Sequence, residues 1–259
     1  MFRRLLPLLL LSLSTLAQQP TLSKTLQEYV RIQSAKVILT HVRTIDGTGA
    51  PADDDRNIVI ESGKIAAIEK GADVAASPNV TVLNLRGYTV MPGIVGMHNH
   101  LYYIARPDID AERHFESPVV LPQLTFSAPR LYLAGGVTTM RTTGSVETYA
   151  DLNLKHDIDA GKLAGPHLDV TGPYLEGATS YFIQMHHLAG PDDATQTVNF
   201  WADRGVTSFK AYMNITRDEL KAAIDAAHAR GIKITGHWCS VTTKRPPSSA
   251  LTISNTGSS

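Results

Sequence analysis

The pattern of apolar and polar positions changes at about residue 92. Between residues 36 and 91, short β-branched runs such as VILTHVRTI and VTVLNL are separated by turns rich in Gly, Asp and Ser. The turns at residues 46–49 and 62–64 have the composition of hairpin connections. Short runs with such punctuation predict a small antiparallel β domain over residues 36–91, which we expect to be sandwich-like.

After residue 92, strand-like and helical runs alternate along the chain. We expect helices over residues 121–134, 146–161, 195–204 and 217–230. The expected strands are IVGMHNHLY, VTTMRTTG, HLDVTGPY, VTSFKAYMN and KITGHWC. Thr216 and Glu219 fit a capping box at the start of the last helix, and Gly231 fits its end. This alternation predicts right-handed βαβ units and a parallel sheet.

The alternation alone fits either an open doubly wound sheet or a TIM-type barrel. Polar side chains follow the strand ends, where barrel enzymes place their chemistry, and no G-x-G-x-x-G follows a strand. We therefore expect an α/β fold. Its main part is an incomplete TIM-type (β/α) barrel over residues 92–241, with about five of the eight strands that closure needs.

The two ends of the chain differ from the rest. Residues 1–19 begin with Arg3 and Arg4 and continue with an apolar run that ends at small residues, which predicts a signal peptide. The alternative is an N-terminal anchor helix. We expect an exported, periplasmic or extracellular protein with no membrane attachment after cleavage. Residues 20–35 are expected to be a spacer or a short helix.

Composition narrows the partners and the chemistry. Lys plus Arg and Asp plus Glu number 24 each, so charge gives no indication of a nucleic-acid partner. Cys239 is the single cysteine, which excludes an intrachain disulfide and a cysteine-only metal site. A metal would need His, carboxylates or a modified lysine.

His98 and His100 end the first expected barrel strand. Residues two apart in a strand point to the same side, so both imidazoles can hold one cation while Asn99 points elsewhere. Neutral nitrogen donors suit ions such as Zn, Fe or Mn.

Lys210 and His237 end the fourth and fifth expected strands. Alternation places Lys210 on one face with Ser208 and Tyr212, where a lone ammonium is costly unless it is neutralised or paired. A carbamate on Lys210 would make it a two-oxygen bridging ligand. The alternatives to a role in a metal site are that Lys210 faces solvent and that His237 is an ordinary core or surface histidine.

These residues together resemble the amidohydrolase superfamily, in its prolidase-like and imidazolonepropionase-like branch. MPGIVGMHNHLY resembles the family's first-strand motif, while Lys210 and His237 match its carboxylated lysine and its strand-five histidine. The DGTG turn resembles part of its small β domain. The resemblance covers residues 36–241, and Met97 departs from it because many members carry Asp there.

The resemblance implies a metal-dependent hydrolase of amide, cyclic amide or dipeptide C–N bonds that uses a metal-activated water. His98 and His100 would hold one divalent ion, carboxylated Lys210 would bridge to a second, and His237 would bind that second ion. Two zinc ions and a small-molecule substrate are expected, and an oligomer is compatible with this. The general-base aspartate is expected beyond the C-terminus. Four further residues could line the substrate pocket or form only its polar rim: Arg141, Tyr174, Glu176 and Tyr212.

Residues 242–259 lose the strand–helix alternation. They are either a flexible natural tail or a frameshifted reading, because a back-translation of residues 245–259 read from its third base gives AAELGIDNLEHGFF. We hypothesise a frameshift, and expect an incomplete and poorly active chain. The alternative is a non-catalytic fragment of the same fold with a partial metal site, and metal content distinguishes the two.

Overall fold

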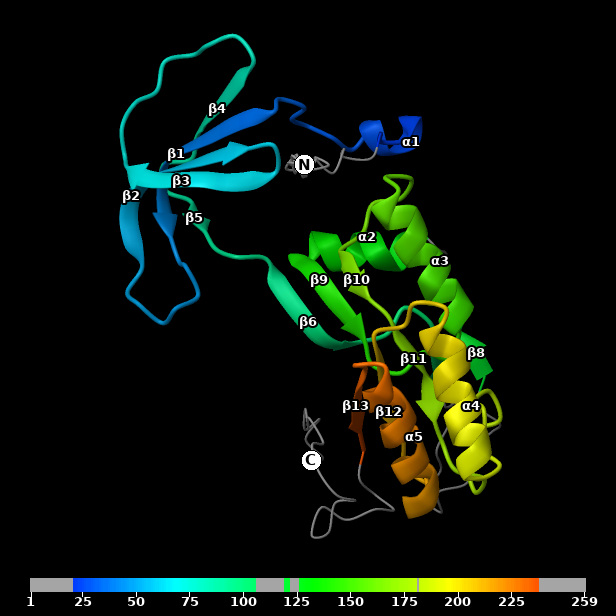
Figure 1. Ribbon diagram of the computed structural model, residues 1–259. Coiled ribbons are helices and arrows are strands. Elements are labelled where there is room, and N and C mark those ends of the chain that lie inside the picture. Colours follow the sequence, from blue (N-terminus) through cyan, green and yellow to red (C-terminus); the bar gives the residue numbers. More distant parts are fainter. Residues whose placement is uncertain (1–20, 106–118, 122–125, 181, 238–259) are drawn as a thin grey trace, which may run out of the picture.

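The computed structural model describes residues 21–105, 119–121, 126–180 and 182–237. The predicted signal peptide, Cys239 and the predicted tail lie outside these residues. Within them, a small β domain precedes an α/β part (Figure 1). A short helix, α1 (Lys24–Gln27), lies in the predicted spacer. In this part of the chain, no helix has the length and hydrophobicity needed to cross a membrane.

The small domain is one sheet in which β1 forms hydrogen bonds to three other strands. Its strands are β1 (Lys36–Thr44), β2 (Asp53–Glu61), β3 (Lys64–Lys70), β4 (Val80–Asn84) and β5 (Thr89–Val90). The two predicted hairpins are confirmed, since β1–β2 and β2–β3 are antiparallel. Ser62 and Gly63 both have positive φ, of 50° and 77°, as a tight two-residue turn requires.

The prediction of a purely antiparallel domain is wrong. Both β4 and β5 run parallel to β1, so the sheet is mixed. Residues 71–79 carry the chain from β3 at one edge to β4 at the other, and a crossover of this kind makes neighbouring strands parallel. The described residues of this domain form a single sheet, and the sandwich-like arrangement stays a prediction.

The α/β part confirms the predicted βαβ pattern. Its parallel strands follow one another in chain order: β6 (Ile94–Asn99), β9 (Val137–Thr142), β10 (His167–Asp169) with β11 (Thr171–Leu175), β12 (Ser208–Ala211) and β13 (Lys233–Gly236). The pairs β6–β9, β9–β10, β11–β12 and β12–β13 are all parallel. Consecutive parallel order is how a (β/α) barrel begins.

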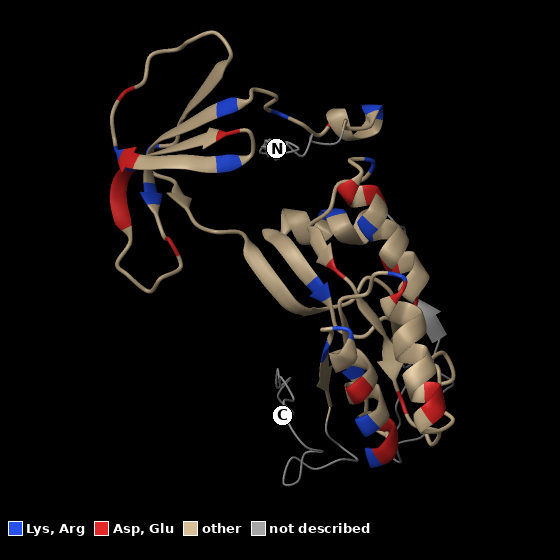
Figure 2. Cartoon of the chain, in the orientation of Figure 1, with Lys and Arg blue, Asp and Glu red and all other residues tan. Residues whose placement is uncertain are grey.

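Helices connect these strands and pack against the two three-stranded sheets that the strands form, β10-β9-β6 and β11-β12-β13 (Figure 1). They are α2 (Ser127–Ala134), α3 (Thr148–Asp159), α4 (Pro191–Ala202) and α5 (Arg217–Ala229). The capping box of Thr216 and Glu219 is confirmed, and Gly231 after α5 has a φ of 69°. Basic and acidic residues are interspersed along α3 and α5 (Figure 2).

Two helix starts differ from prediction. The first helix begins at Ser127 rather than residue 121, because Val119–Leu121 form a strand, β8, paired with β7 (Tyr103–Ala105). Leu121 precedes a proline, which disfavours helical backbone at that residue. Helix α4 begins at Pro191, ahead of residue 195, because proline is well suited to the first turn of a helix.

The main core lies between the helices and the parallel strands. On α5, Leu220, Ala223 and Ile224 are buried against the same cluster as Phe209 of β12 and Ile234 of β13. Their spacing is that of one helix face. This packing fixes β12 and β13 side by side, and thereby fixes where Lys210 and His237 lie.

Candidate functional site

His98 and His100 lie at the end of β6, with ring centres 5.4 Å apart and planes at 74°. Thr143 holds the backbone around them. Its amide donates to the carbonyl of Asn99 at 3.0 Å, and its hydroxyl donates to the carbonyl of Met97 at 3.0 Å. His98 is exposed, whereas His100 is half-buried. The two predicted histidines therefore lie close together, and Thr143, directly after β9, fixes the backbone that carries them.

Both imidazoles favour the neutral form. Burial, followed by the charges of Lys210 and His98, lowers the pKa of His100 to about 4. Burial, followed by Lys210 and Arg141, also lowers the pKa of His98. The Nδ1 atom of His100 is buried and has no hydrogen-bond partner among the described residues. A neutral imidazole with a free nitrogen is the form that ligates a metal.

His237 follows β13 and joins the same group. Its ring centre lies 6.4 Å from that of His98 and 5.2 Å from that of Tyr212. Its amide donates to the carbonyl of Ala211 at 3.1 Å, which extends the β12–β13 pairing by one residue. Burial, then Lys210 and His98, lowers its pKa.

Lys210 is 2% exposed, so it is not the solvent-facing lysine of the alternative interpretation. Its Nζ lies 5.5 Å from the ring centre of Tyr174 and 5.6 Å from that of Tyr212. Burial, followed by the charge of Arg141, lowers its pKa to about 8. The pKa of each of the three histidines is lowered by Lys210 in turn. The charge of Lys210 therefore acts on all three histidines at these strand ends.

The four residues predicted for the pocket lie in three different settings. Tyr174 and Tyr212 flank Lys210, with their own ring centres 4.7 Å apart. Burial raises the pKa of Tyr174 well above its usual range. Glu176 is fully buried just beyond β11. A pocket role for these three residues stays a prediction.

Arg141 lies deeper in the sheet than Lys210. Its guanidinium donates to the hydroxyl of Ser208 from Nε at 3.1 Å and from Nη2 at 3.0 Å, and Nη2 also donates to the hydroxyl of Thr235 at 3.2 Å. Ser208 begins β12, two residues before Lys210. Arg141 thus braces β9 against β12 and β13, and its role toward substrate stays a prediction.

Tyr103 is a site residue that the sequence argument missed. Its ring stacks on that of His100, with centres 4.3 Å apart and planes at 29°. The available signal was its position in HNHLYY, directly after the histidine pair. A ring stacked on one face of His100 limits the rotation of the imidazole.

The spacing of the imidazoles fits metal binding in part. Two histidines that ligate one zinc ion at about 2.1 Å place their ring centres about 5 Å apart, which His98 and His100 match. Among the described residues, however, no three His, Cys, Asp or Glu side chains are grouped to hold a single ion. The spacing therefore fits His98 and His100 at one ion, and a second ion at Lys210 and His237 stays a prediction.

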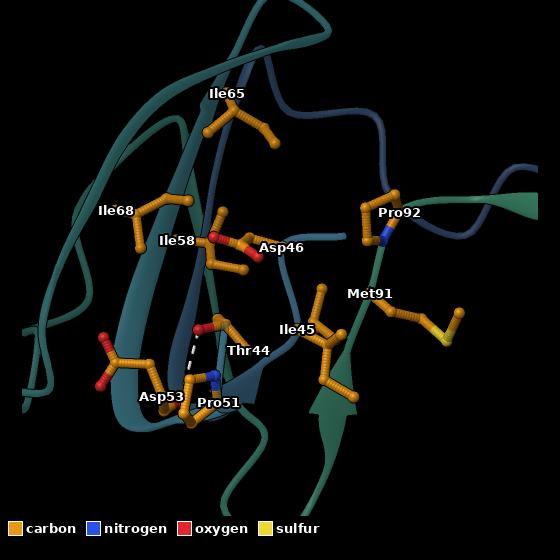
Figure 3. Close-up of a pocket in the computed structure, with 11 residues that line it drawn as sticks. Thr44, Ile45, Asp46, Pro51, Asp53, Ile58, Ile65, Ile68, Met91 and Pro92 are labelled. Atoms are coloured by element: carbon orange, nitrogen blue, oxygen red, sulfur yellow. Dashed lines mark hydrogen bonds between the residues drawn. The ribbon is translucent and has the colours of Figure 1, made fainter. Parts of the chain in front are cut away.

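A cavity of about 340 Å³ lies elsewhere, in the small domain (Figure 3). Ile58, Ile65 and Ile68 line one side of it, and Met91 and Pro92 line the other. The residues that line it do not include His98, His100, His237 or Lys210. We therefore do not assign the chemistry to this cavity.

Comparisons with known proteins bear on the family and the fold of the chain. No protein-family model matches the chain. It is 33% identical over 73 residues to an N-substituted formamide deformylase from Arthrobacter pascens, covering 27% of this chain and 13% of that protein. It is 27% identical over 141 residues to a dihydroorotase from Elusimicrobium minutum (strain Pei191), covering 53% of this chain and 28% of that protein.

In structure, the chain matches a crystallised Xaa-Pro dipeptidase with methionine bound in its active site. The TM-score is 0.61 with 21% sequence identity, over 78% of this chain and 56% of the dipeptidase. The resemblance to the amidohydrolase superfamily is confirmed. The chain spans about half the length of the Xaa-Pro dipeptidase, and less of the length of the deformylase and of the dihydroorotase. The structural match covers most of the described α/β part, and the incomplete barrel stays a prediction.

Proposed function

We propose that this chain is a metal-dependent hydrolase, or part of one, that acts on C–N bonds of small amides or dipeptides. The observation that carries the proposal is the grouping of His98, His100 and His237 around buried Lys210 at the ends of parallel strands. Strand ends are where barrel enzymes carry out their chemistry. The amide-hydrolysing relatives support the bond type.

Four residues would hold the divalent ions. His98 and His100 offer neutral imidazoles, and His100 has a buried nitrogen that lacks another partner among the described residues. Lys210, as a carbamate, would offer two oxygens between two ions, and His237 would serve the second ion. When bound, such ions lower the pKa of a water molecule and polarise a substrate carbonyl. Zinc is the ion that we propose, since imidazoles suit it.

The chain's own residues prepare this site in two ways. Burial keeps the three imidazoles neutral and favours the neutral amine of Lys210, the form that reacts with carbon dioxide to give a carbamate and a proton. Tyr103, Tyr174 and Tyr212 pack beside His100 and Lys210, and restrict how these side chains move. The tyrosines also supply aromatic surface next to the site.

The alternative is a non-catalytic chain with a partial metal site. It is favoured by the lack, within the described residues, of a group of three ligand side chains around one ion. This alternative predicts one bound ion or none, and no hydrolysis.

We also propose that the chain is exported, because residues 1–19 have the pattern of a signal peptide.

Hydrolysis in the presence of zinc tests the proposal. The purified chain is incubated with zinc and bicarbonate, and with a panel of Xaa-Pro dipeptides, N-acyl amino acids and cyclic amides. We expect zinc-dependent release of amine or amino acid, reduced at least about 100-fold in His100→Ala and Lys210→Met. His186→Ala is the matched control, because His186 pairs with Asp193 on the surface. Zinc binding without hydrolysis would favour the non-catalytic alternative.

A further inference from the structure

Glu176 stands out because its carboxyl group is fully buried at the C-terminal end of β11. It follows β11 directly and is 0% exposed. Its Oε1 accepts one hydrogen bond from the amide of Gly177 at 2.8 Å and another from the amide of Asn214 at 2.7 Å. Its Oε2 is buried and has no partner among the described residues. One oxygen of the side chain thus accepts both of these backbone hydrogen bonds.

The two amides belong to different loops. Gly177 lies in the loop after β11, and Asn214 lies in the loop that joins β12 to α5. The two backbones touch here, because a Cβ atom at Gly177 would overlap the carbonyl oxygen of Asn214. A buried amide that loses its acceptor is costly. The Glu176 carboxylate therefore holds the second loop against the first.

The clasped loops carry the tyrosines that flank Lys210. Glu176 is two residues after Tyr174, and Asn214 is two residues after Tyr212. The amide of Tyr212 donates to the carbonyl of Leu175 at 2.9 Å, so the clasp continues the β11–β12 pairing beyond the strands. If the second loop moved away from the first, Tyr212 would move relative to both Lys210 and His237.

We propose that Glu176 is a positioning residue, which fixes Tyr212 and through it Lys210 and His237 by clasping the loop after β12. It acts through its Oε1 as a hydrogen-bond acceptor. Its consequence for metal affinity rests on the proposed function, whereas the clasp itself does not. The sequence interpretation, in which Glu176 lines the substrate pocket, differs because it requires an oxygen that faces a ligand.

Two variants separate the acceptor from the bulk of the side chain. Glu176→Gln keeps a carbonyl oxygen in the place of Oε1, and its amide nitrogen takes the place of Oε2. Glu176→Met keeps a side chain of similar length and removes the acceptor. Leu154→Ala is the control for general destabilisation, because Leu154 is buried on α3 and belongs to neither loop.

Hydrogen exchange of the full chain reads the clasp directly. In wild type we expect slow exchange at the amides of Gly177 and Asn214. In Glu176→Met we expect exchange at least about 10-fold faster over residues 212–216, with β13 unchanged, and in Glu176→Gln we expect rates within about 3-fold of wild type. In Leu154→Ala, any acceleration is shared across the sheet. Fast exchange at Asn214 in wild type overturns the proposal even if a variant fails to fold.

Zinc affinity, measured by competition with a chromophoric chelator, adds the second readout. We expect Glu176→Met to bind zinc about 10-fold more weakly than wild type, and Glu176→Gln and Leu154→Ala to match wild type. Equal affinity in all four proteins, or equal loss in both Glu176 variants, overturns the positioning role. If wild type binds no zinc, the proposed function fails, and the exchange data alone decide whether Glu176 clasps the loops.

Discussion

The hydroxyl of Ser145 donates a 2.5 Å hydrogen bond to Oδ2 of Asp151. The other oxygen of Asp151 is buried and has no partner among the described residues. The Ser145 hydroxyl oxygen also lies 2.8 Å from the carbonyl oxygen of Thr171, so Ser145 lies between the start of α3 and β11. Burial outweighs the hydrogen bond from Ser145 and raises the pKa of Asp151 to about 7.

This raised pKa predicts that Asp151 makes the protein less stable as pH rises. A carboxyl group whose pKa is higher in the folded state binds its proton more tightly there, so its contribution to stability falls between about pH 4 and pH 7. We expect Asp151→Asn to be more stable than wild type at pH 8, by on the order of 2 kcal/mol, and to lose the advantage near pH 4. Urea denaturation at both pH values measures this difference.

Asp159→Asn is the matched control for Asp151→Asn. Asp159 also lies on α3, but it is on the surface and pairs with Lys155. We expect its effect to stay below about 1 kcal/mol at both pH values. A wild type and an Asp151→Asn variant that show the same dependence of unfolding free energy on pH would contradict the buried, proton-binding carboxyl.

His41 is predicted to keep its proton to a higher pH than an ordinary histidine. Its Nδ1 lies 2.6 Å from Oδ1 of Asp55 and its Nε2 lies 3.0 Å from Oδ1 of Asp73. Carboxylate oxygens accept hydrogen bonds, so both ring nitrogens donate only when the imidazole is protonated. The hydrogen bond with Asp55, followed by that with Asp73, raises its pKa. Its contribution to stability should therefore be complete below about pH 6.5 and be lost as pH rises through the raised pKa.

Nitrogen-15 NMR of the His41 ring measures that pKa. We expect a pKa above the ordinary histidine value in wild type, and a lower one in Asp73→Asn. Asp54→Asn, whose carboxylate faces Arg43 instead, should leave it nearly unchanged. A ring that loses a proton at the ordinary pKa in wild type would show that the two carboxylates do not hold an imidazolium.

Much of the fold was predictable because its signals are local. The hairpin at Ser62, the capping box at Thr216 and the alternation of strands and helices each depend on neighbours in the chain. The parallel pairing of β1 with β4 was not predictable in this way, because it depends on where residues 71–79 carry the chain. The strand at Val119–Leu121 depends likewise on a partner, β7, that lies earlier in the sequence.

The site was predictable to the extent that strand ends meet. Alternation placed Lys210 inside. His98 and His237 end the first and last of the parallel strands, β6 and β13, so the strand order alone does not predict that their ring centres lie 6.4 Å apart. The stacking of Tyr103 on His100 and the clasp of Glu176 depend on loop conformation, which no periodicity records. His41 received no role from the sequence, because its left-handed backbone, with a φ of 60°, and its two carboxylate partners arise only from the folded sheet.

Lys210 is predicted to form a carbamate. Its pKa of about 8 leaves a substantial fraction of neutral amine at slightly alkaline pH, and only that form adds carbon dioxide. Carbon-13 NMR with labelled bicarbonate and zinc should show a carbamate resonance in wild type that is absent in Lys210→Arg. Lys221→Arg, at an exposed surface pair, should keep it. A resonance that persists in Lys210→Arg would place the modification elsewhere.

Zinc titration with a competing chelator tests the proposed metal centre most directly. The proteins to compare are wild type, the double variant His98→Ala with His100→Ala, and His186→Ala as the surface control. We predict that wild type and His186→Ala bind zinc with equal affinity, and that the double variant binds at least about 100-fold more weakly. Zinc binding that is absent in wild type, or unchanged in the double variant, would contradict a metal site at the end of β6.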